Sequence, residues 1–143
     1  MIDSIASAKE YLEKNSLTFC AIKDGEIYTS DKSGIAPILS KMDGDIMYFS
    51  GATILDKVIG KAAAMLLAKS NATKIYALLI SDEAIKVLEK EKIPYEYEKR
   101  VPYIKNRGNT GLCPMEQAVL GISDLDEAFR VLREKVKSMI KNK

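Results

Sequence analysis

The chain has 143 residues, 47% of them hydrophobic and 29% charged, which is typical of one globular domain spanning residues 1–143. Its net charge is only +2, and no basic run is long enough to follow a phosphate backbone, which argues against a nucleic-acid partner. No apolar run reaches the roughly 20 residues of a membrane span and no signal-peptide core is present, so we expect no membrane partner and a cytoplasmic location.

The first half of the chain predicts two helices and three strands. Residues 2–15 carry apolar side chains at a helical period. Two β-rich runs, 17–23 and 26–30, flank Asp24-Gly25, a dipeptide typical of a tight hairpin turn. The remaining elements predicted here are a short helix over 34–41 and a third strand over 45–50.

The second half predicts alternating helices and strands. A long apolar helix is expected from Thr53 to Ser70, and the almost continuous apolar run 74–80 is typical of a central strand covered on both faces. The remaining predicted elements are a helix over 82–91, a strand over 95–100, a short helix over 114–120 and a final helix after residue 123. This alternation requires parallel crossovers, while the hairpin adds an antiparallel pair. We therefore predict an α/β fold, a three-layer α/β/α sandwich around a five-stranded mixed sheet.

The absence of histidine limits the chemistry of the chain more than any residue that is present. It removes the commonest general base and the commonest zinc ligand. With Cys20 and Cys113 as the two cysteines, one chain cannot build a tetrahedral zinc site from nitrogen and sulfur ligands. No group of carboxylates has the spacing of a magnesium or calcium site. We therefore expect no metal, no cofactor and no disulfide.

The first candidate site lies within the predicted long helix, at residues 56–64, DKVIGKAAA. Lys57 and Lys61 are four residues apart, so on a helix they would share one face near its N-terminus and could hold an anionic ligand. Two structural interpretations compete with this one. Asp56 can complete a capping box with Thr53, and both lysines can simply carry their charge from a buried helix to the surface.

The second candidate site begins with a polar loop at residues 106–111, NRGNTG. Asn106, Arg107 and Thr110 offer hydrogen-bond donors to a phosphate or carboxylate, and an arginine can bind either group through two parallel bonds. The competing interpretation is an ordinary surface loop in which the two glycines supply positive φ angles.

The same site continues into a predicted helix start. Cys113 would be the N-cap, Pro114 the first helical residue and Glu116 the third. A thiol at this position faces unpaired N–H groups and the positive end of the helix dipole, and both favour thiolate. The structural alternatives are that Glu116 completes a capping box with Cys113 and that the thiol is a small buried apolar group.

The two sites together resemble a known family. The stretches 56–64 and 106–116, together with VPYI at 101–104 and AVLG at 118–121, are similar to a small prokaryotic family of uncharacterised proteins, the domain-of-unknown-function family 1893. The resemblance covers nearly the whole chain in order. It implies membership of the cytidine-deaminase-like fold superfamily, and it implies no established reaction.

The wider superfamily implies zinc-dependent deamination, with His-x-Glu or Cys-x-Glu at the start of one helix and Pro-Cys-x-x-Cys at the next. By chain order these motifs would fall near residues 56–61 and 81–84, and neither is present. Cys113-Pro114 follows one strand too late and has no second cysteine. The resemblance therefore implies the fold without zinc and without hydrolytic deamination.

Three functions remain open. The leading hypothesis is a small-molecule binder for an anionic or nucleotide-like ligand. The second is an enzyme that uses Cys113 or Lys61 as a nucleophile or base. The third is an interaction module, a homo-oligomer joined through the final helix or the tyrosine-bearing strand. We expect both stretches to converge on one pocket. The candidate ligand-binding residues are Asp56, Lys57, Lys61, Asn106, Arg107, Thr110, Cys113 and Glu116.

Overall fold

The computed structural model describes residues 2–106 and 108–141, with the backbone alone for residues 140 and 141. Its strands are β1 (Phe19–Lys23), β2 (Glu26–Ser30), β3 (Thr53–Ile59), β4 (Lys74–Ser81) and β5 (Tyr95–Val101). They form one sheet in the order β2-β1-β3-β4-β5. β1 is antiparallel to β2 and β3, whereas β3, β4 and β5 are parallel. The predicted mixed sheet of five strands is therefore confirmed.

The hairpin between β1 and β2 has the turn that its sequence predicts. Asp24 and Gly25 both have positive φ angles, of 50° and 81°. Two central residues with positive φ give a turn whose twist matches that of the flanking strands. The turn sets the register in which Ile22 pairs with Ile27.

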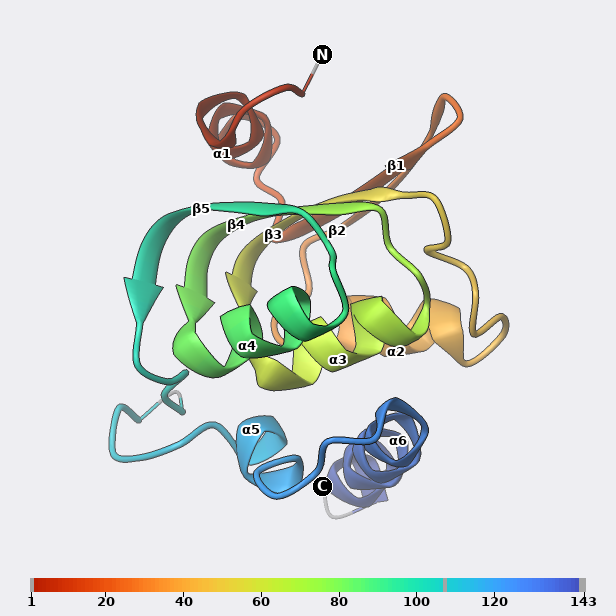
Figure 1. Cartoon of the computed structure of the whole chain (residues 1–143), viewed down its shortest axis with the longest axis vertical. Coiled ribbons are helices and arrows are strands. Elements are labelled where there is room, and N and C mark those ends of the chain that lie inside the picture. Colours follow the sequence, from red (N-terminus) through yellow and green to blue (C-terminus); the bar gives the residue numbers. More distant parts are fainter. Residues whose placement is uncertain (1, 107, 142–143) are drawn as a thin grey trace.

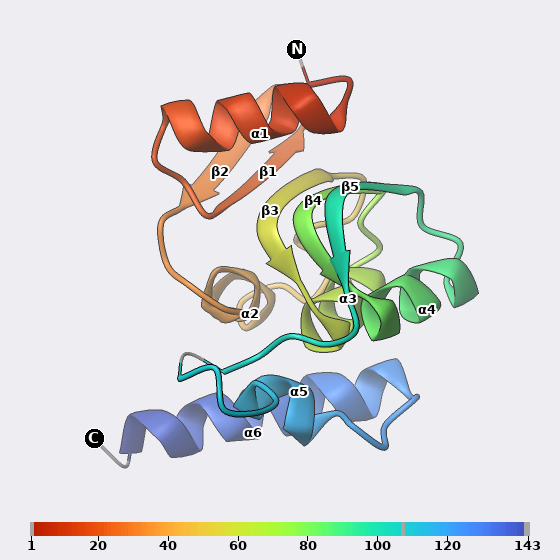
Figure 2. The ribbon, with the colours of Figure 1, turned by 90° about the vertical axis from the view of Figure 1, so that its left-hand side faces the viewer.

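Helices cover both faces of the sheet (Figures 1 and 2). The helices are α1 (Ile5–Lys14), α2 (Ala36–Met42), α3 (Lys61–Lys69), α4 (Asp82–Lys90), α5 (Pro114–Ala118) and α6 (Leu125–Lys141). α1 lies on one face, here called the outer face, and α2, α3 and α4 lie on the opposite, inner face. α5 and α6 pack on the side of α3 that is away from the sheet. Among the described helices, none is long and apolar enough to cross a membrane.

The two faces of the sheet bury separate apolar clusters. On the inner face, Ile54 and Ile75 pack against α3, in which every residue from 62 to 68 is buried. On the outer face, Leu55 and Tyr76 pack against Leu12 of α1. The inner cluster is much the larger, so α3 is the central helix of the fold.

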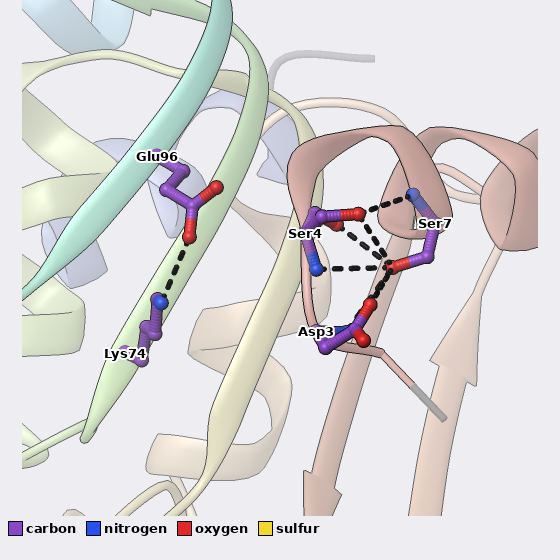
Figure 3. A network of polar contacts seen from close by, with 5 residues as sticks. All are labelled: Asp3, Ser4, Ser7, Lys74 and Glu96. Atoms are coloured by element: carbon purple, nitrogen blue, oxygen red, sulfur yellow. Dashed lines mark hydrogen bonds and ion pairs between the residues drawn. The ribbon is translucent and has the colours of Figure 1, made fainter.

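α1 begins with a reciprocal cap formed by Ser4 and Ser7 (Figure 3). The Ser4 hydroxyl accepts the Ser7 N–H at 3.1 Å, and the Ser7 hydroxyl accepts the Ser4 N–H at 3.1 Å. On β4 and β5, Lys74 and Glu96 form an ion pair at 2.9 Å. The cap satisfies N–H groups at the start of α1, and the ion pair joins β4 to β5.

The predicted third strand over residues 45–50 is wrong. Residues 46–51 form turns, and they carry Phe49 into the inner core, where it is fully buried. Its ring centroid lies 5.7 Å from that of Phe19 and 5.1 Å from that of Tyr48, both in edge-on geometry. The apolar and aromatic residues of this run therefore serve packing rather than strand pairing.

The predicted long helix from Thr53 to Ser70 is also wrong, because its first half is β3. Gly60 is the N-cap that separates β3 from α3. Ile54, Val58 and Ile59 are β-branched and favour a strand, whereas the alanines and leucines after residue 61 favour a helix. A helix and a strand are distinguished in sequence by the spacing of their polar positions. A segment that is buried on all sides has no such positions, so its apolar pattern alone cannot show whether it is a helix or a strand.

Candidate functional site

The two stretches singled out in the sequence meet at the start of α3. The Glu116 carboxylate, from α5, accepts the Lys61 N–H at 2.7 Å and the Ala62 N–H at 2.8 Å. The first N–H groups of a helix have no intrahelical partners, and they lie at the positive end of its dipole. Gly60 makes room for this contact. A Cβ there would lie 2.4 Å from Glu116 Oε1 and 2.8 Å from Ile104 Cγ1.

The Lys61 side chain makes the reciprocal contact with the end of α5. Its ammonium donates to the carbonyls of Val119 at 2.7 Å and Leu120 at 3.2 Å. Carbonyls at a helix C-terminus also lack partners and favour a cation. Lys61 and Glu116 therefore each satisfy the end of the other's helix, and in this arrangement the Lys61 amine is already engaged.

The predicted capping box between Glu116 and Cys113 is wrong. Cys113 is the N-cap of α5 and Pro114 follows it, as predicted, but the Glu116 carboxylate binds α3 instead. Glu116 is 7% exposed, and this burial raises the pKa of its carboxyl group. The N–H groups of Ala62 and Lys61 and the charge of Lys61 lower that pKa and offset part of the effect.

The capping box between Thr53 and Asp56 is also wrong, because Asp56 lies in the middle of β3. It is 6% exposed, and its Oδ1 accepts the Val58 N–H at 3.2 Å. Burial raises the pKa of this carboxyl group well above its ordinary value, and the N–H groups of Val58 and Lys57 lower it only in part. Asp56 is therefore a buried acid whose polar contacts stay within its own strand.

We predict that Asp56→Asn stabilises the protein at neutral pH. The pKa of Asp56 is higher in the folded protein than in the unfolded chain, so ionising this carboxyl group destabilises the fold. This loss of stability grows as the pH rises from the pKa of the unfolded chain towards the pKa of the folded protein. Asparagine keeps an oxygen for the Val58 N–H and carries no charge. The expected gain is about 1 to 3 kcal/mol near pH 7.5, and it should be smaller near pH 4.5.

Urea unfolding of both proteins at the two pH values measures this difference. Asp31→Asn is the matched control, because that residue is exposed and forms none of the described ion pairs. A gain that is the same at both pH values would show that the charge of Asp56 is not its cause.

The chain after β5 folds back on itself as a short hairpin. Lys105 and Leu112 form an antiparallel bridge, and the Cys113 N–H donates to the Ile104 carbonyl at 2.9 Å. One arm of the hairpin therefore continues from β5, and the other arm leads directly into α5.

Polar groups that were predicted to bind a ligand close the tip of this hairpin. Asn106 Oδ1 accepts the Thr110 N–H at 3.0 Å, and Asn106 Nδ2 donates to Thr110 Oγ1 at 3.1 Å. These groups bind each other. The third predicted donor, Arg107, lies outside the described residues.

The two cysteines have different surroundings. Cys113 is half-buried and its side chain makes no capping hydrogen bond, whereas Cys20 is fully buried in β1. Burial raises the pKa of the Cys20 thiol to about 11. Cys113 is therefore the cysteine that a reagent can reach in the folded protein.

We predict that iodoacetamide labels Cys113 faster than Cys20 in the native protein. Alkylation requires an accessible thiolate, and Cys20 has neither the exposure nor the ionisation for it. Peptide mass spectrometry over a time course measures both rates, and urea-unfolded protein is the control in which the rates should converge. Equal rates in the native protein would contradict the different burial of the two thiols.

The hairpin forms one wall of an apolar hollow on the outer face, at the carboxyl ends of β3, β4 and β5. The hollow measures about 510 Å³. Its lining residues are Val58, Leu79, Val101, Pro102, Tyr103, Ile104 and Lys105. In Figure 2 this part of the sheet faces the viewer, between α1 above and α5 below. Val58 is 42% exposed and Tyr103 is 44% exposed, so part of the apolar lining is open to a ligand.

A kink in the parallel strands opens this surface. Ile54 and Ile59 both belong to the inner core although they are five residues apart, and so do Ile75 and Ile80. A regular strand places residues five apart on opposite faces, so β3 and β4 each change face between these pairs. Figure 1 shows the strands bending together. The kink turns Val58 outward into the hollow.

One exposed lysine lines the hollow, and two more exposed lysines adjoin residues of its lining. Lys105 belongs to its lining, Lys57 directly precedes Val58, and Lys99 pairs with Leu79 across the ladder. The predicted helix face shared by Lys57 and Lys61 is therefore wrong, since Lys57 lies on a strand. Among the described residues, none of the three lysines around the hollow has an acidic partner. Their uncompensated charge favours an anion at this place.

A second hollow, of about 480 Å³, lies between α1 and β5. Charged side chains of both signs line it, and two of them, Lys9 and Glu98, already form an ion pair at 2.9 Å. It therefore lacks an apolar floor, and its three glutamates outnumber its two lysines.

Sequence reasoning did not identify the apolar hollow. It treated residues 101–104 only as part of a family pattern. The available signal was the apolar run VPYI directly after a predicted strand that ends in the charged pair Lys99-Arg100. An apolar run of this kind tends to pack against other apolar residues, and here it lies beside Val58 and Leu79 near the ends of the neighbouring strands.

The structure defines an α/β protein whose mixed sheet carries an apolar, lysine-rimmed hollow at its carboxyl edge. Residues 7–136 match the family model described as TM1506, domain of unknown function (DUF1893), and the chain belongs to this family. The fold is similar to the crystal structure of a DUF1893 family protein (TM1506) from Thermotoga maritima. The two share 28% sequence identity with a TM-score of 0.83, over 94% of this chain and 92% of that chain. No functionally curated protein matches the chain.

Proposed function

We propose that this protein binds a small anionic ligand with an apolar or nucleotide-like body in the hollow on the outer face. The observation that carries the proposal is the pairing of an apolar lining with three exposed lysines that have no acidic partner among the described residues. Ligands of open α/β sheets bind beyond the carboxyl ends of the strands, which is where the hollow lies. Its volume falls within the roughly 300 to 1,000 Å³ of small-molecule sites.

The ligand would lie with its body on the sheet and its charge at the rim. Val58 and Leu79 offer an apolar floor, and the exposed Tyr103 ring offers a stacking surface for a planar group. Lys57 and Lys105 are the nearest candidates to hold the anion. Of the residues predicted from the sequence, Lys57 thus keeps a direct binding role, and Asp56, Lys61, Asn106, Thr110 and Glu116 support the walls.

We also infer a cytidine-deaminase-like fold without the zinc chemistry of that superfamily. Zinc deaminases take their metal ligands from motifs at the starts of two successive helices. Here α3 starts at Gly60-Lys61 and α4 at Ser81-Asp82, which offer neither cysteine nor histidine. In the part of the chain that the structure describes, no three cysteine, aspartate or glutamate side chains gather as metal ligands would. These residue types favour binding over deamination.

The two alternative functions draw less support from the contacts. As an enzyme nucleophile or base, Lys61 would first have to leave two carbonyl acceptors, while Cys113 keeps an accessible thiol. As an oligomer seam, α6 would need a free apolar stripe, but Phe129 and Leu132 already pack in the inner core beside α3.

Fluorescence titration with anilinonaphthalene sulfonate tests the binding proposal, because this probe joins an aromatic body to a permanent anion. We expect one saturable site per chain, competed by nucleoside monophosphates or by other small anions with an apolar body. Replacing Lys57, Lys99 and Lys105 together by alanine should weaken binding by about tenfold, and added salt should do the same.

Two matched controls separate the hollow from other apolar surface. Val58→Glu blocks the hollow, whereas Ile27→Glu changes a more exposed apolar residue on β2, and only the former should abolish binding. Lys90→Ala removes an exposed lysine from the end of α4 and should leave affinity unchanged. Equal losses for Val58→Glu and Ile27→Glu would show that the probe binds apolar surface in general, and the proposal would then fail.

A further inference from the structure

One tyrosine in the wall of the hollow lacks the partners that the other tyrosines have. Tyr103 lines the hollow and is 44% exposed. Among the described residues its ring contacts no other aromatic ring and no cation, and its hydroxyl forms no hydrogen bond. The remaining tyrosines each have a ring contact or pack against a core cluster: Tyr11, Tyr28, Tyr48, Tyr76, Tyr95 and Tyr97. The Tyr103 ring is therefore available to a partner that the described part of the chain does not supply.

The backbone on either side of Tyr103 is held in place. Val101, at the end of β5, pairs with Ser81 of β4, and the Ile104 carbonyl accepts the Cys113 N–H at 2.9 Å. Tyr103 lies between these two contacts and directly follows Pro102, whose ring restricts the backbone. An exposed ring on a restrained backbone loses little freedom when a ligand covers it, and this favours binding.

The rest of the lining offers apolar surface and few hydrogen-bonding groups. Its apolar side chains are those of Val58, Leu79, Val101, Pro102 and Ile104. The polar side-chain groups in this described lining are the Tyr103 hydroxyl and the Lys105 ammonium. A surface of this composition recognises the face of a planar group rather than a pattern of donors and acceptors at its edge.

We propose that Tyr103 is the specificity-determining residue of the hollow and that the ligands are aromatic anions, which stack a planar ring on Tyr103 and place their charge near Lys105. This inference rests on the proposed function, because it concerns the same hollow. It narrows the ligand class from apolar bodies in general to planar aromatic ones. Small aryl phosphates or carboxylates and nucleotides share this chemistry.

Stacking and plain apolar burial predict different orders of affinity for two esters of the same charge. Phenyl phosphate and cyclohexyl phosphate carry rings with the same number of carbon atoms on the same anionic group. The saturated ring offers at least as much apolar area, so burial alone favours it or makes the two equal. Its puckered shape prevents stacking, whereas the flat phenyl ring gains a contact with Tyr103 beyond the area that it buries. We therefore expect phenyl phosphate to bind about three- to tenfold more tightly.

Displacement of anilinonaphthalene sulfonate from the full chain measures both affinities in wild type, Tyr103→Leu and Tyr103→Phe. Leucine keeps an apolar side chain and removes the ring, so the preference for phenyl phosphate should fall below about twofold. Phenylalanine keeps the ring and should keep the preference. Tyr97→Leu is the matched control, because Tyr97 is 37% exposed but does not belong to the lining, and its preference should equal that of wild type.

Two nucleotides separate the sources from which the ring could come. Adenosine and guanosine monophosphate present similar stacking faces and different hydrogen-bonding edges. If nucleotides belong to the ligand class, both should displace the probe with affinities within about threefold of each other. If phenyl phosphate alone displaces it, the class is restricted to small aryl anions. A difference above about tenfold between the two nucleotides would overturn the inference, because the edge of the base would then be recognised.

The remaining outcomes distinguish this inference from the proposed function. Equal binding of the two esters to wild type, tighter binding of cyclohexyl phosphate, or a preference that persists in Tyr103→Leu would overturn the inference and leave the binding proposal standing. Failure of wild type to bind the probe at a saturable site, or failure of every anion to displace it, would instead remove the proposed function. Urea unfolding shows whether Tyr103→Leu keeps its fold, and the wild-type comparison of the two esters tests the inference without any substitution.

Discussion

Replacing Gly60 by alanine is expected to lower the free energy of unfolding by about 1 to 3 kcal/mol, and replacement by valine should cost more. The new Cβ would lie 2.4 Å from Glu116 Oε1 and 2.8 Å from Ile104 Cγ1. Neither group can withdraw freely, because the carboxylate is bound to two N–H groups and Ile104 belongs to a hydrogen-bonded hairpin. The φ angle of Gly60 is −100°, so its backbone itself would accept a side chain and the whole effect is steric.

Gly121→Ala is the matched control for this substitution. Gly121 follows the end of α5, and a Cβ there would meet nothing within 4 Å. Urea unfolding of the two variants gives the comparison directly, and the control should change stability by less than about 0.5 kcal/mol. If Gly60→Ala unfolds like wild type, the close contact of Gly60 with Glu116 and Ile104 is not a fixed part of the fold.

Glu116→Ala is expected to destabilise the protein by about 2 to 4 kcal/mol, the other large effect that the structure predicts. The truncation removes the acceptor of two N–H groups at the start of α3 and leaves a gap beside Gly60. It also removes a negative charge that interacts with the Lys61 ammonium, which caps α5. The contact between the two helices should therefore weaken at both ends.

The control for Glu116→Ala is Glu134→Ala, which removes an exposed glutamate from α6 that forms none of the described ion pairs. Thermal unfolding followed by circular dichroism compares the two variants at one pH. A further check uses Lys61→Met, which keeps most of the stem and removes the ammonium. If Glu116→Ala and Glu134→Ala have the same stability, the Glu116 carboxylate stabilises the start of α3 no more than water would.

Sequence patterns predicted those elements in which one face is polar or the turn chemistry is specific. The hairpin at Asp24-Gly25 needs two positive φ angles that this dipeptide tolerates, and it has them. α6 keeps a clear apolar stripe, because its other side meets water. The helix start at Cys113-Pro114 follows from the fixed φ of proline.

The patterns failed where burial removed the contrast between faces. The boundary between β3 and α3 lies inside one apolar run. Asp56 was assigned to a cap because its spacing from Thr53 matches a common capping pattern. The predicted meeting of the two stretches is observed, but the contact joins two helix ends. The apolar hollow depends on a kink in neighbouring strands and on a hairpin from a distant part of the chain, and no local pattern contains that information.

The carboxylate at the start of α3 determines where an external anion can compete. A helix N-terminus beside the end of a strand is a common site for phosphate, yet here Glu116 already fills it from within the same chain. A group that the fold itself holds at this place acts as a competitor with an effective concentration on the order of millimolar or above. Free phosphate and carboxylate metabolites at lower concentration are therefore displaced from this helix end. Accessible positive charge at the strand ends lies instead by the hollow, where Lys105 belongs to the lining and Lys57 and Lys99 adjoin lining residues.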